Sequence, residues 1–333
     1  MTSNRQLFDI PLEVASGSRF QPTGFPDLGT ATFKRPVRHG GQTTWTNAIL
    51  VESAQSIANH LEGAGWDFGA EQPVPVLDGL PYVRVLSADG AYITSSRTEA
   101  HRLASAFIKD ATLGGEDMKA VICKRLGLRE DVPHAPRQIA RAVMGLDPMC
   151  LLHGVFFAES AKIWPGQPKI ARAVTGFIEA TEVERADSGG VKRDAVRHSI
   201  GEGAGGSSEG YGTIPFHRTE WTAAEITAFF TIDLGQIASY GLGDAGSALL
   251  RAIAQWEIRS FLDGGLRLRT ACDLSAISDV VTDRAGVALP NAETLSSEIS
   301  RLIPLCADML DGGVTDVVWN GGAKKTKTKA EES

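Results

Sequence analysis

Apolar residues at helical spacing predict several amphipathic helices. The clearest lies at residues 53–63, where positions such as Ile57 and Leu61 share one helix face. A second helix, near residues 96–108, is predicted by the capping-box spacing of Ser96 and Glu99. Further apolar stripes predict helices at residues 118–126, 136–145, 245–262 and 293–310.

Alternating and β-branched residues predict strands among these helices. The most regular alternation places Leu266 and Leu268 on one face of a strand, and Arg267 and Arg269 on the other. Helices and strands occur in mixed order without an internal repeat, which favours an α+β fold over a doubly wound sheet. The other predicted extended segments are residues 8–20, 43–52, 150–158, 172–186, 214–221, 226–238 and 315–320.

Two segments show neither the helical period nor the alternation of a strand. Residues 19–42 contain several glycines and prolines and are predicted to form a long polar loop, a type of segment that is often functional. Residues 186–213 are the loosest part of the chain, because Gly201–Gly212 is rich in glycine and cannot hold regular structure cheaply.

The composition indicates a globular protein, with 43% hydrophobic and 22% charged residues. The chain has 33 Lys+Arg against 40 Asp+Glu, and the resulting net charge of −7 excludes a generally basic nucleic-acid coat. Residues 323–333 reverse this balance, since they are rich in lysine, and are expected to form a disordered basic tail.

Cysteine spacing and hydropathy indicate a cytoplasmic protein. The four cysteines are far apart and form no CxxC pair, so we expect reduced core residues. The N-terminus lacks the pattern of a signal peptide, and no apolar run approaches the length of a membrane span. No histidine pair has metal-ligand spacing, so no metal site is predicted.

A glycine motif offers one enzymatic interpretation. Gly241, Gly243 and Gly246 follow an extended segment and open the predicted helix at residues 245–262, which is the order of a dinucleotide-binding fingerprint. The preceding segment is interrupted by polar residues, and no strand ends in an acidic residue about twenty positions later. An NAD(P)-dependent oxidoreductase therefore stays open as the alternative function.

Basic residues gather in windows that hold few acids. Residues 29–46 and 160–177 contain basic side chains and no Asp or Glu. Such loops beside a sheet suit a groove that tracks a nucleic-acid backbone. An ordinary solvated surface explains the same charges, and both interpretations stay open at this point.

Several motifs occur in the order found in one known family. On these motifs, from about Gly17 to Ile303, the chain resembles the crRNA-binding backbone subunit of type I-G (formerly I-U) CRISPR Cascade effector complexes, a member of the RAMP superfamily. The motifs are RFQPTGFPDLGTATF, LVESAQSIANHLE, HGVFF, the run from FIEATEVERADSGGVKRDAV through EGYGTIPFHRTEWTA, and YGLG with GLRLRTACDL.

The resemblance implies an α+β fold of a particular kind. Residues 1–322 would form a single domain with an RRM-like (ferredoxin-like βαββαβ) palm. Residues 64–150 would form a helical finger-like insertion, and residues 186–213 a flexible thumb region. The glycines of SGGVKRDAV would give the thumb its turn.

The resemblance also implies partners and a role. Copies would stack as a helical filament along the crRNA spacer, and the guide would pair with target DNA. The expected partners are crRNA, target DNA through the guide, neighbouring copies and other Cascade subunits. No cofactor, no membrane and no enzymatic activity are expected. A guide-loaded RNase, as in backbone subunits of type III complexes, is a third possibility.

The resemblance directs attention to side chains that would contact RNA. The helix at residues 53–63 would offer polar side chains near its N-terminus, where backbone amides are free. The expected RNA-binding residues are Arg19, Gln21, Lys34, Arg35, Arg38, His39, Ser53, Gln55, Ser56, Asn59, Lys169, Arg172, Lys192, Arg193, Arg267 and Arg269.

Overall fold

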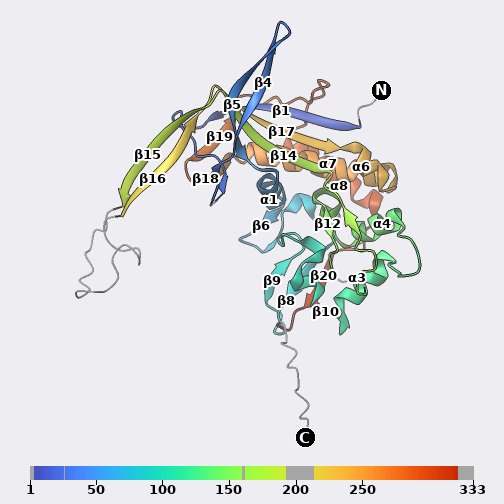
Figure 1. The fold of residues 1–333 in the computed structure, drawn as a ribbon. Coiled ribbons are helices and arrows are strands. Elements are labelled where there is room, and N and C mark those ends of the chain that lie inside the picture. The colour runs from blue at the N-terminus through green and yellow to red at the C-terminus, as the bar shows by residue number, and fades with distance from the viewer. Residues whose placement is uncertain (1–3, 26, 160–161, 193–213, 322–333) are drawn as a thin grey trace, which may run out of the picture.

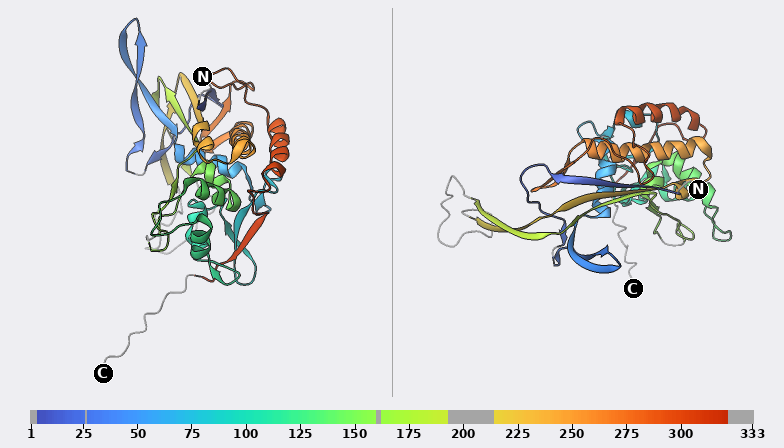
Figure 2. Two further views of the ribbon diagram at one scale, coloured as in Figure 1. Left: turned by 90° about the vertical axis from the view of Figure 1, so that its right-hand side faces the viewer. Right: turned by 90° about the horizontal axis from the view of Figure 1, so that it is seen from above.

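The main layer of the molecule is a seven-stranded sheet with helices on one face (Figures 1 and 2). The computed structural model describes residues 4–25, 27–159, 162–192 and 214–321. Helices and strands are mixed along the chain, which confirms the α+β prediction. In spatial order the strands are β18 (Leu266–Arg269), β19 (Cys272–Ala276), β1 (Arg5–Val14), β17 (Glu225–Asp233), β14 (Val174–Thr181), β5 (Gln42–Glu52) and β4 (Thr32–His39).

Side chains of the central strands alternate between a buried face and an open face, as the two-residue period of a strand requires. Phe230 and Ile232 of β17 point to the buried face, while Phe229 of β17 stacks on Phe177 of β14 on the open one, with ring centroids 5.1 Å apart. Helices cover the buried side: α1 (Ala54–Ala64) and α7 (Gly243–Asp263) contact the sheet, and α8 (Ala292–Leu302) packs outside α7 (Figure 2).

Two long hairpins interrupt the chain order of this layer. Along the chain, β1, α1, β14, β17, α7 and β19 follow one another, and in the sheet β19, β1, β17 and β14 are neighbours in antiparallel pairs. The hairpin β4–β5 is inserted between β1 and α1. A second hairpin, β15 (Glu184–Lys192) with β16 (Ile214–Thr222), is inserted between β14 and β17. The hairpin β15–β16 and the far end of β4–β5 project beyond the rest of the sheet (Figure 1).

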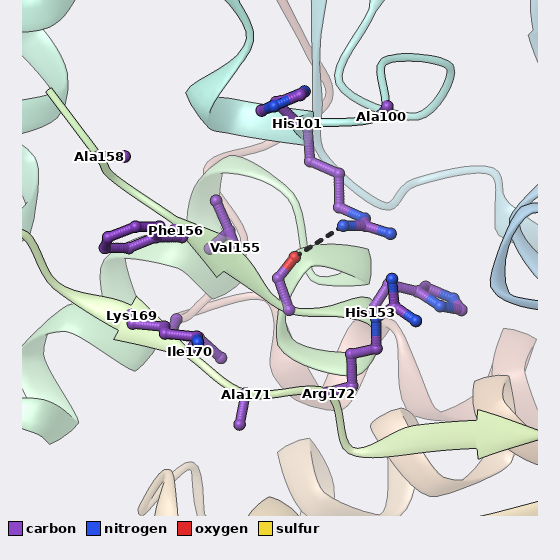
Figure 3. A pocket seen from close by; sticks show the side chains of 12 residues that line it. Ala100, His101, His153, Val155, Phe156, Ala158, Lys169, Ile170, Ala171 and Arg172 are labelled. Carbon is purple, nitrogen blue, oxygen red and sulfur yellow. Dashed lines mark hydrogen bonds between the residues drawn. The ribbon is translucent and has the colours of Figure 1, made fainter. Parts of the chain in front are cut away.

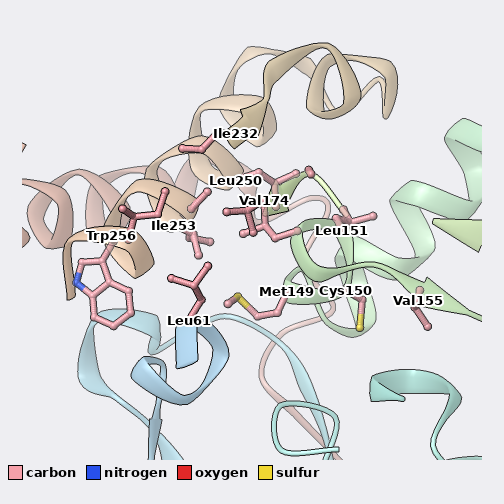
Figure 4. Close-up of a cluster of buried hydrophobic side chains, with 14 of the residues drawn as sticks. Leu61, Met149, Cys150, Leu151, Val155, Val174, Ile232, Leu250, Ile253 and Trp256 are labelled. Atoms are coloured by element: carbon pink, nitrogen blue, oxygen red, sulfur yellow. The ribbon is translucent and has the colours of Figure 1, made fainter. Parts of the chain in front are cut away.

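The core lies between the sheet and its helices. Leu61 of α1, Met149 and Leu151 of α5 (Met149–His153), Val174 and Ile253 meet there (Figure 4). Burial of one such side chain stabilises the fold by roughly 1.5–3 kcal/mol. The helix predicted at residues 53–63 is confirmed, since its apolar stripe faces this core.

A second, smaller sheet is built mainly from the segment between α1 and β14. Its last strand comes from the C-terminal part of the chain and runs parallel to β8. The predicted helical insertion at residues 64–150 therefore contains strands as well as helices. The sequence did not show these strands, because strands of two to five residues are too short to show a period. The strands are β11 (Glu116–Asp117), β10 (Thr112–Leu113), β20 (Val314–Val318), β8 (Tyr82–Leu86) and β9 (Tyr92–Ser95), and the helices beside them are α2 (Ala106–Lys109), α3 (Met118–Leu126) and α4 (Pro136–Leu146).

Short elements complete the described chain. Among the described residues, no helix has the length and apolar character needed to cross a membrane. The short elements are the pairs β2 (Gly24–Phe25) with β3 (Gly29–Thr30), β6 (Trp66–Asp67) with β7 (Gln72–Pro73) and β12 (Val155–Phe156) with β13 (Lys169–Ile170), the helix α6 (Leu234–Ser239), and 3₁₀ turns at Pro75–Leu77, Arg102–Ala104 and Pro304–Cys306.

The helix predicted at residues 96–108 is wrong. Arg102 has a φ of 49°, a left-handed conformation that an α-helix does not accept. The carboxylate of Glu99 does not cap a helix. It accepts hydrogen bonds from Thr94 Oγ1 at 2.8 Å and Ser105 Oγ at 2.7 Å. Only α2 forms, and it begins after Ser105.

Two predicted strands also differ from the structure. Residues 150–158 form the end of α5 and then β12, because the chain turns at Gly154, where φ is 81°. A short apolar run does not distinguish a buried helix from a buried strand. Residues 172–186 are divided at Glu182, where φ is 53°, into β14 and β15. The first of these is an inner strand of the sheet rather than an exposed one.

The alternating stretch at residues 265–274 forms two strands rather than one. The chain turns at Ala271, where φ is 62°, so β18 and β19 pair with each other. Residues 234–239, expected to be extended, form α6. Its N-cap is Asp233, whose Oδ1 accepts a hydrogen bond from the Gln236 amide at 2.8 Å.

The remaining elements agree with the sequence apart from their ends. The extended segment at residues 8–20 is β1, which ends at Val14. The last helix ends at Leu302, because Pro304 opens a 3₁₀ turn. The confirmed helices are those at 118–126, 136–145 and 245–262, and the confirmed strands are those at 43–52, 214–221 and 315–320.

Three predictions fall wholly or partly outside the described residues. The glycine-rich stretch Gly201–Gly212, Arg193 and the lysine-rich tail at residues 323–333 lie outside them. The described part of the loose region, up to Lys192, is not irregular but belongs to β15. Gly189 and Gly190 are likewise strand residues, paired with His217 and Phe216, so they do not form the turn expected of them.

Candidate nucleic-acid interface

A groove of about 1020 Å³ lies between the loop that carries β2 and β3 and the hairpin β15–β16. Within the described part of the chain, no Asp or Glu side chain lines it. A lining of cations and aromatic rings without carboxylates is what nucleic-acid phosphates and bases require. The cationic or titratable side chains are Arg185, His217, Arg218 and Arg269, and the aromatic ones are Phe25, Phe216 and Trp221.

Backbone pairing holds the two walls of the groove together. The amide of Phe20 donates to the Trp221 carbonyl, and the amide of Trp221 donates to the Phe20 carbonyl, both at 2.9 Å. The Trp221 indole donates to Thr30 Oγ1 at 3.3 Å. Since Phe20 is fully buried, the base of the hairpin is fixed against the N-terminal loop.

The groove cations are oriented by carboxylates that do not line it. Asp187 Oδ1 lies 2.9 Å from Arg185 Nε, and Glu220 Oε1 lies 3.7 Å from Arg218 Nη1. The Arg218 guanidinium also lies over the Phe216 ring, 5.7 Å from its centroid. The pair of Arg185 and Asp187 is solvent-exposed and so contributes little, roughly 0–1 kcal/mol. Arg185 can therefore exchange its carboxylate for a phosphate at small cost.

Arg269 connects the groove to the core. Its Nη1 donates to the carbonyls of Gln21 at 3.1 Å and Val51 at 3.2 Å, and its Nη2 pairs with the fully buried carboxylate of Glu52. Burial raises the pKa of the neighbouring Cys272 thiol to about 11, so this thiol stays protonated. Arg269, expected to bind RNA, thus lines the groove, but its guanidinium already binds Gln21, Val51 and Glu52.

Arg19 and Gln21 lie at one end of the same region. Arg19 Nη1 is 3.7 Å from Glu220 Oε2, the carboxylate that also faces Arg218, and its side chain is 54% exposed. The Gln21 amide donates to the carbonyl of Ala271 at 2.7 Å. The structure therefore brings three expected residues, Arg19, Gln21 and Arg269, to one region.

Comparison with known proteins places the chain in a family. The family model of CRISPR-associated protein GSU0053 (Cas_GSU0053) matches residues 7–185, more than half of the chain. The chain belongs to the Cas_GSU0053 family. No curated protein matches it. Among solved structures, a chain entitled "CRISPR RNA-guided surveillance complex, pre-nicking" is similar at a TM-score of 0.36 and 14% identity, covering 83% of this chain and 74% of that one.

In this Cas_GSU0053 protein, four of the expected residues lie on a strand and not on a loop. Lys34, Arg35, Arg38 and His39 belong to β4, which pairs with β5 up to the turn at residues 40–41. The loop prediction for residues 19–42 is therefore wrong over its second half. The end of the hairpin projects from the sheet, and β4, the edge strand, buries no side chain along its length, so no apolar period marks it.

The hairpin β4–β5 presents two different faces. Register places Lys34 and Arg38 on one face together with Trp45, whose side chain is 62% exposed. Arg35 and His39 lie on the other face, where Arg35 Nη1 is 3.3 Å from Glu225 Oε2. Lys34 Nζ donates to Asn47 Oδ1 at 2.5 Å. Arg38 has no side-chain partner among the described residues.

The expected residues of α1 are divided between structural and exposed positions. Ser53 is the N-cap, and its hydroxyl accepts a hydrogen bond from the Ser56 amide at 3.3 Å. Gln55 and Asn59 are exposed, whereas Ser56 is half-buried. The same helix end touches Arg172, because Arg172 Nη1 donates to the Ala54 carbonyl at 3.3 Å.

The other expected residues do not join the groove. Lys169 and Arg172 line a separate pocket of about 520 Å³ (Figure 3). Lys192 is the last residue of β15, and Arg193 lies outside the described residues. Arg267 is exposed on β18, opposite Asp273 of β19.

The glycine motif has no strand in front of it. Gly241 lies between the helices α6 and α7, and Gly243 is the first residue of α7, whereas a dinucleotide fingerprint requires a strand that ends at the glycine turn. Gly246 sits inside α7, and an added Cβ there would come within 3.3 Å of Met309 Cε, so its role is close packing. Within the described ranges, no group of three or more His, Cys, Asp or Glu side chains could hold a metal ion.

Sequence reasoning missed most of the groove. Arg185, Phe216 and Arg218 were not singled out, because each lies in a segment that otherwise reads as an ordinary strand. The available signal was the run PFHRTEW, which places two aromatic rings and two basic side chains within seven residues. Only the pairing of β15 with β16 brings Arg185 next to this run.

Proposed function

We propose that this Cas_GSU0053 protein binds crRNA as the repeated backbone subunit of a type I-G CRISPR surveillance complex and holds the guide ready to pair with target DNA. The carrying observation is the carboxylate-free groove at the base of the hairpin β15–β16, in a chain of a CRISPR-associated family. A net charge of −7 does not oppose this role, because the groove concentrates its cations locally.

The groove has the chemistry of a site that tracks a single strand. Guanidinium groups bind phosphate oxygens without regard to sequence, and aromatic rings stack on any base. Arg185 and Arg218 would supply phosphate contacts, and the half-exposed rings of Phe25 and Phe216 would supply stacking surfaces. A subunit that must hold many different spacers needs sequence-independent contacts of this kind.

The topology supports an RRM-like palm. The chain order β1, α1, β14, β17, α7, β19 and the sheet order β19, β1, β17, β14 are those of a βαββαβ unit. In this proposal the hairpin β15–β16 is the base of the thumb, and the segment that forms α2 to α5 with the smaller sheet is the finger-like insertion of a single domain.

The hairpin β4–β5 is the second contact region in this proposal. Lys34, Arg38 and Trp45 on one of its faces would contact RNA or the adjacent copy in a filament. Neighbouring copies, other Cascade subunits and, through the guide, target DNA are the partners that follow from this role. The subunit itself would carry out no chemistry.

The direct test is co-expression of the full chain with a CRISPR array. The purified protein should carry RNA of uniform length and absorb strongly at nucleic-acid wavelengths. Protein that remains free of RNA and binds NAD would instead support the oxidoreductase alternative, against which the position of α6 already argues. Incubation of the assembled complex with complementary RNA and a divalent metal should yield no regularly spaced products, and such products would identify a guide-loaded RNase.

A further inference from the structure

A pocket distinct from the groove lies where the chain passes from α5 into β12 and β13. It has a volume of about 520 Å³ and shares none of its lining residues with the groove (Figure 3). Five cationic or titratable side chains line it: His101, Arg102, His153, Lys169 and Arg172. No carboxylate lines it among the described residues.

Two of these cations are neutralised by carboxylates outside the pocket. Arg102 binds Glu62 through two hydrogen bonds, at 2.5 and 2.6 Å, and its Nη1 donates to the Gly154 carbonyl at 3.0 Å. His153 Nε2 lies 2.9 Å from Glu257 Oε1, and both side chains are fully buried. These pairs fix the positions of the guanidinium and the imidazole without leaving a free charge.

The other two cations have no such partner. Within the described residues, neither Lys169 nor Arg172 contacts a carboxylate. Lys169 Nζ lies over the Phe156 ring, 5.8 Å from its centroid, and Arg172 has only the long bond to the Ala54 carbonyl. Burial and the nearby guanidinium of Arg102 lower the pKa of Arg172. The pocket lining thus holds two cations without a carboxylate partner, one of them partly desolvated.

A buried polar atom in the pocket lining also lacks a partner. In the described part of the molecule, His153 Nδ1 makes no hydrogen bond, although its side chain is completely buried. Burial lowers the pKa of His153, but the carboxylates of Glu257 and Glu62 outweigh burial and raise it above its ordinary value. In the charged ring, Nδ1 would be a buried donor without an acceptor. Arg172 extends toward this ring (Figure 3).

We propose that this pocket binds a phosphate group. Arg172 and Lys169 would donate hydrogen bonds to its oxygens, and the unpartnered Nδ1 of His153, in the charged ring, would donate to the same anion. Charge-assisted bonds of this kind are the strong ones, and the volume admits a phosphate with an attached nucleoside. The phosphate could belong to the guide backbone or to a free phosphate compound. Assigning it to the guide rests on the proposed function, whereas the binding of an anion in this pocket does not.

The test begins with the full-length chain expressed without a CRISPR array. Inorganic phosphate is titrated into the protein in a chloride buffer and followed by calorimetry. We expect saturable binding that weakens roughly tenfold or more in Arg172→Gln and in Lys169→Gln. Lys124→Gln, which removes an exposed lysine of α3 outside the pocket lining, is the matched control and should bind as the unmodified chain does.

Lys169→Gln keeps the outcome interpretable, because Lys169 is exposed and its loss does not endanger folding. Absence of phosphate binding to the unmodified chain, or equal binding by both pocket variants, would overturn the proposal. Failure of the proposed function leaves this titration unaffected, since it uses no RNA.

A second titration on the RNA-loaded complex distinguishes the sources. If the guide backbone occupies the pocket, inorganic phosphate no longer binds in the loaded complex, and the pocket variants retain less RNA. If a free phosphate compound is the natural ligand, inorganic phosphate binds the loaded complex as tightly as the free chain. Each result supports the phosphate site and assigns its occupant.

Discussion

Arg269 lies directly over the buried carboxylate of Glu52 and pairs with it, while its second guanidinium nitrogen holds the carbonyls of Gln21 and Val51. One side chain therefore ties the hairpin β18–β19 to the N-terminal loop and to the end of β5. This connection is part of the groove wall, because Gln21 and Arg269 both line the groove, and the bond from the Gln21 main-chain amide to the Ala271 carbonyl joins the same two segments.

Replacement of Arg269 should cost stability. Arg269→Met leaves Glu52 buried and unpaired, and we expect the free energy of unfolding to fall by on the order of 3 kcal/mol in chemical denaturation. The matched control is Arg267→Met, which removes an exposed arginine two residues away on the same strand and should change stability by less than about 0.5 kcal/mol. The double variant Glu52→Gln with Arg269→Met should recover part of the loss; no recovery would contradict the ion-pair account.

Removal of the groove cations should weaken RNA retention without sequence preference. The double variant Arg185→Gln with Arg218→Gln takes two phosphate contacts away, so the slope of log affinity against log salt should become shallower by roughly 1 to 2. Measurement of RNA bound at several salt concentrations, for several spacers, checks this. Arg129→Gln with Arg141→Gln removes two exposed, ion-paired arginines outside the groove and is the control. A loss confined to some spacers would contradict backbone tracking.

The sequence predicted the parts of this molecule that depend on local patterns. The helix α1 follows from the stripe of Ile57 and Leu61 and from the Ser53 cap, all within one short segment. The strand β4 was missed because this edge strand buries neither of its faces and leaves no period. The groove was missed for a different reason: Arg185 and Arg218 come to line one groove only through the pairing of strands that are about thirty residues apart along the chain.

The Phe216 ring should bind RNA by stacking on a base, rather than serve only to pack the hairpin. Phe216→Ala removes the surface over which Arg218 lies and on which a base would stack, and we expect RNA affinity to fall by about 1–3 kcal/mol. Phe216→Tyr keeps the ring and should retain most of the affinity. Equal losses in the two variants would show that the ring is a packing element of the hairpin, as its position over Gly190 would then suggest.

The basic side chains of the hairpin β4–β5 should contribute to RNA binding independently of the groove. Replacement of Lys34, Arg35 and Arg38 together by Gln should weaken RNA retention for all spacers equally and reduce its salt dependence. Arg38→Gln alone should account for a large share, because Lys34 and Arg35 already have partners in Asn47 and Glu225. Loss of assembly with RNA affinity intact would assign this hairpin to the contact between copies.

The buried pair of His153 and Glu257 should make stability depend on pH. The native pKa of His153 is raised above its ordinary value of 6.5, because the facing carboxylates of Glu257 and Glu62 outweigh burial and the repulsion of Arg102. The folded chain therefore binds this proton more tightly than the unfolded chain. Its contribution to stability is complete below pH 6.5 and is lost as the pH rises through the native pKa.

The variant Glu257→Gln separates this effect from the other titrating groups. Without the carboxylate, burial dominates and lowers the pKa of His153, so the sign of its contribution reverses and stability gains as the pH rises. The measurement is the free energy of unfolding between pH 6 and 9 in phosphate-free buffer, compared between the two proteins. The difference between their slopes reports the pair of His153 and Glu257, since every other titrating group is shared; burial also raises the pKa of the Glu257 carboxyl, whose own titration the variant removes. Parallel slopes would mean that His153 is neutral in the native protein, and its free Nδ1 would then be an acceptor rather than the donor that a phosphate requires.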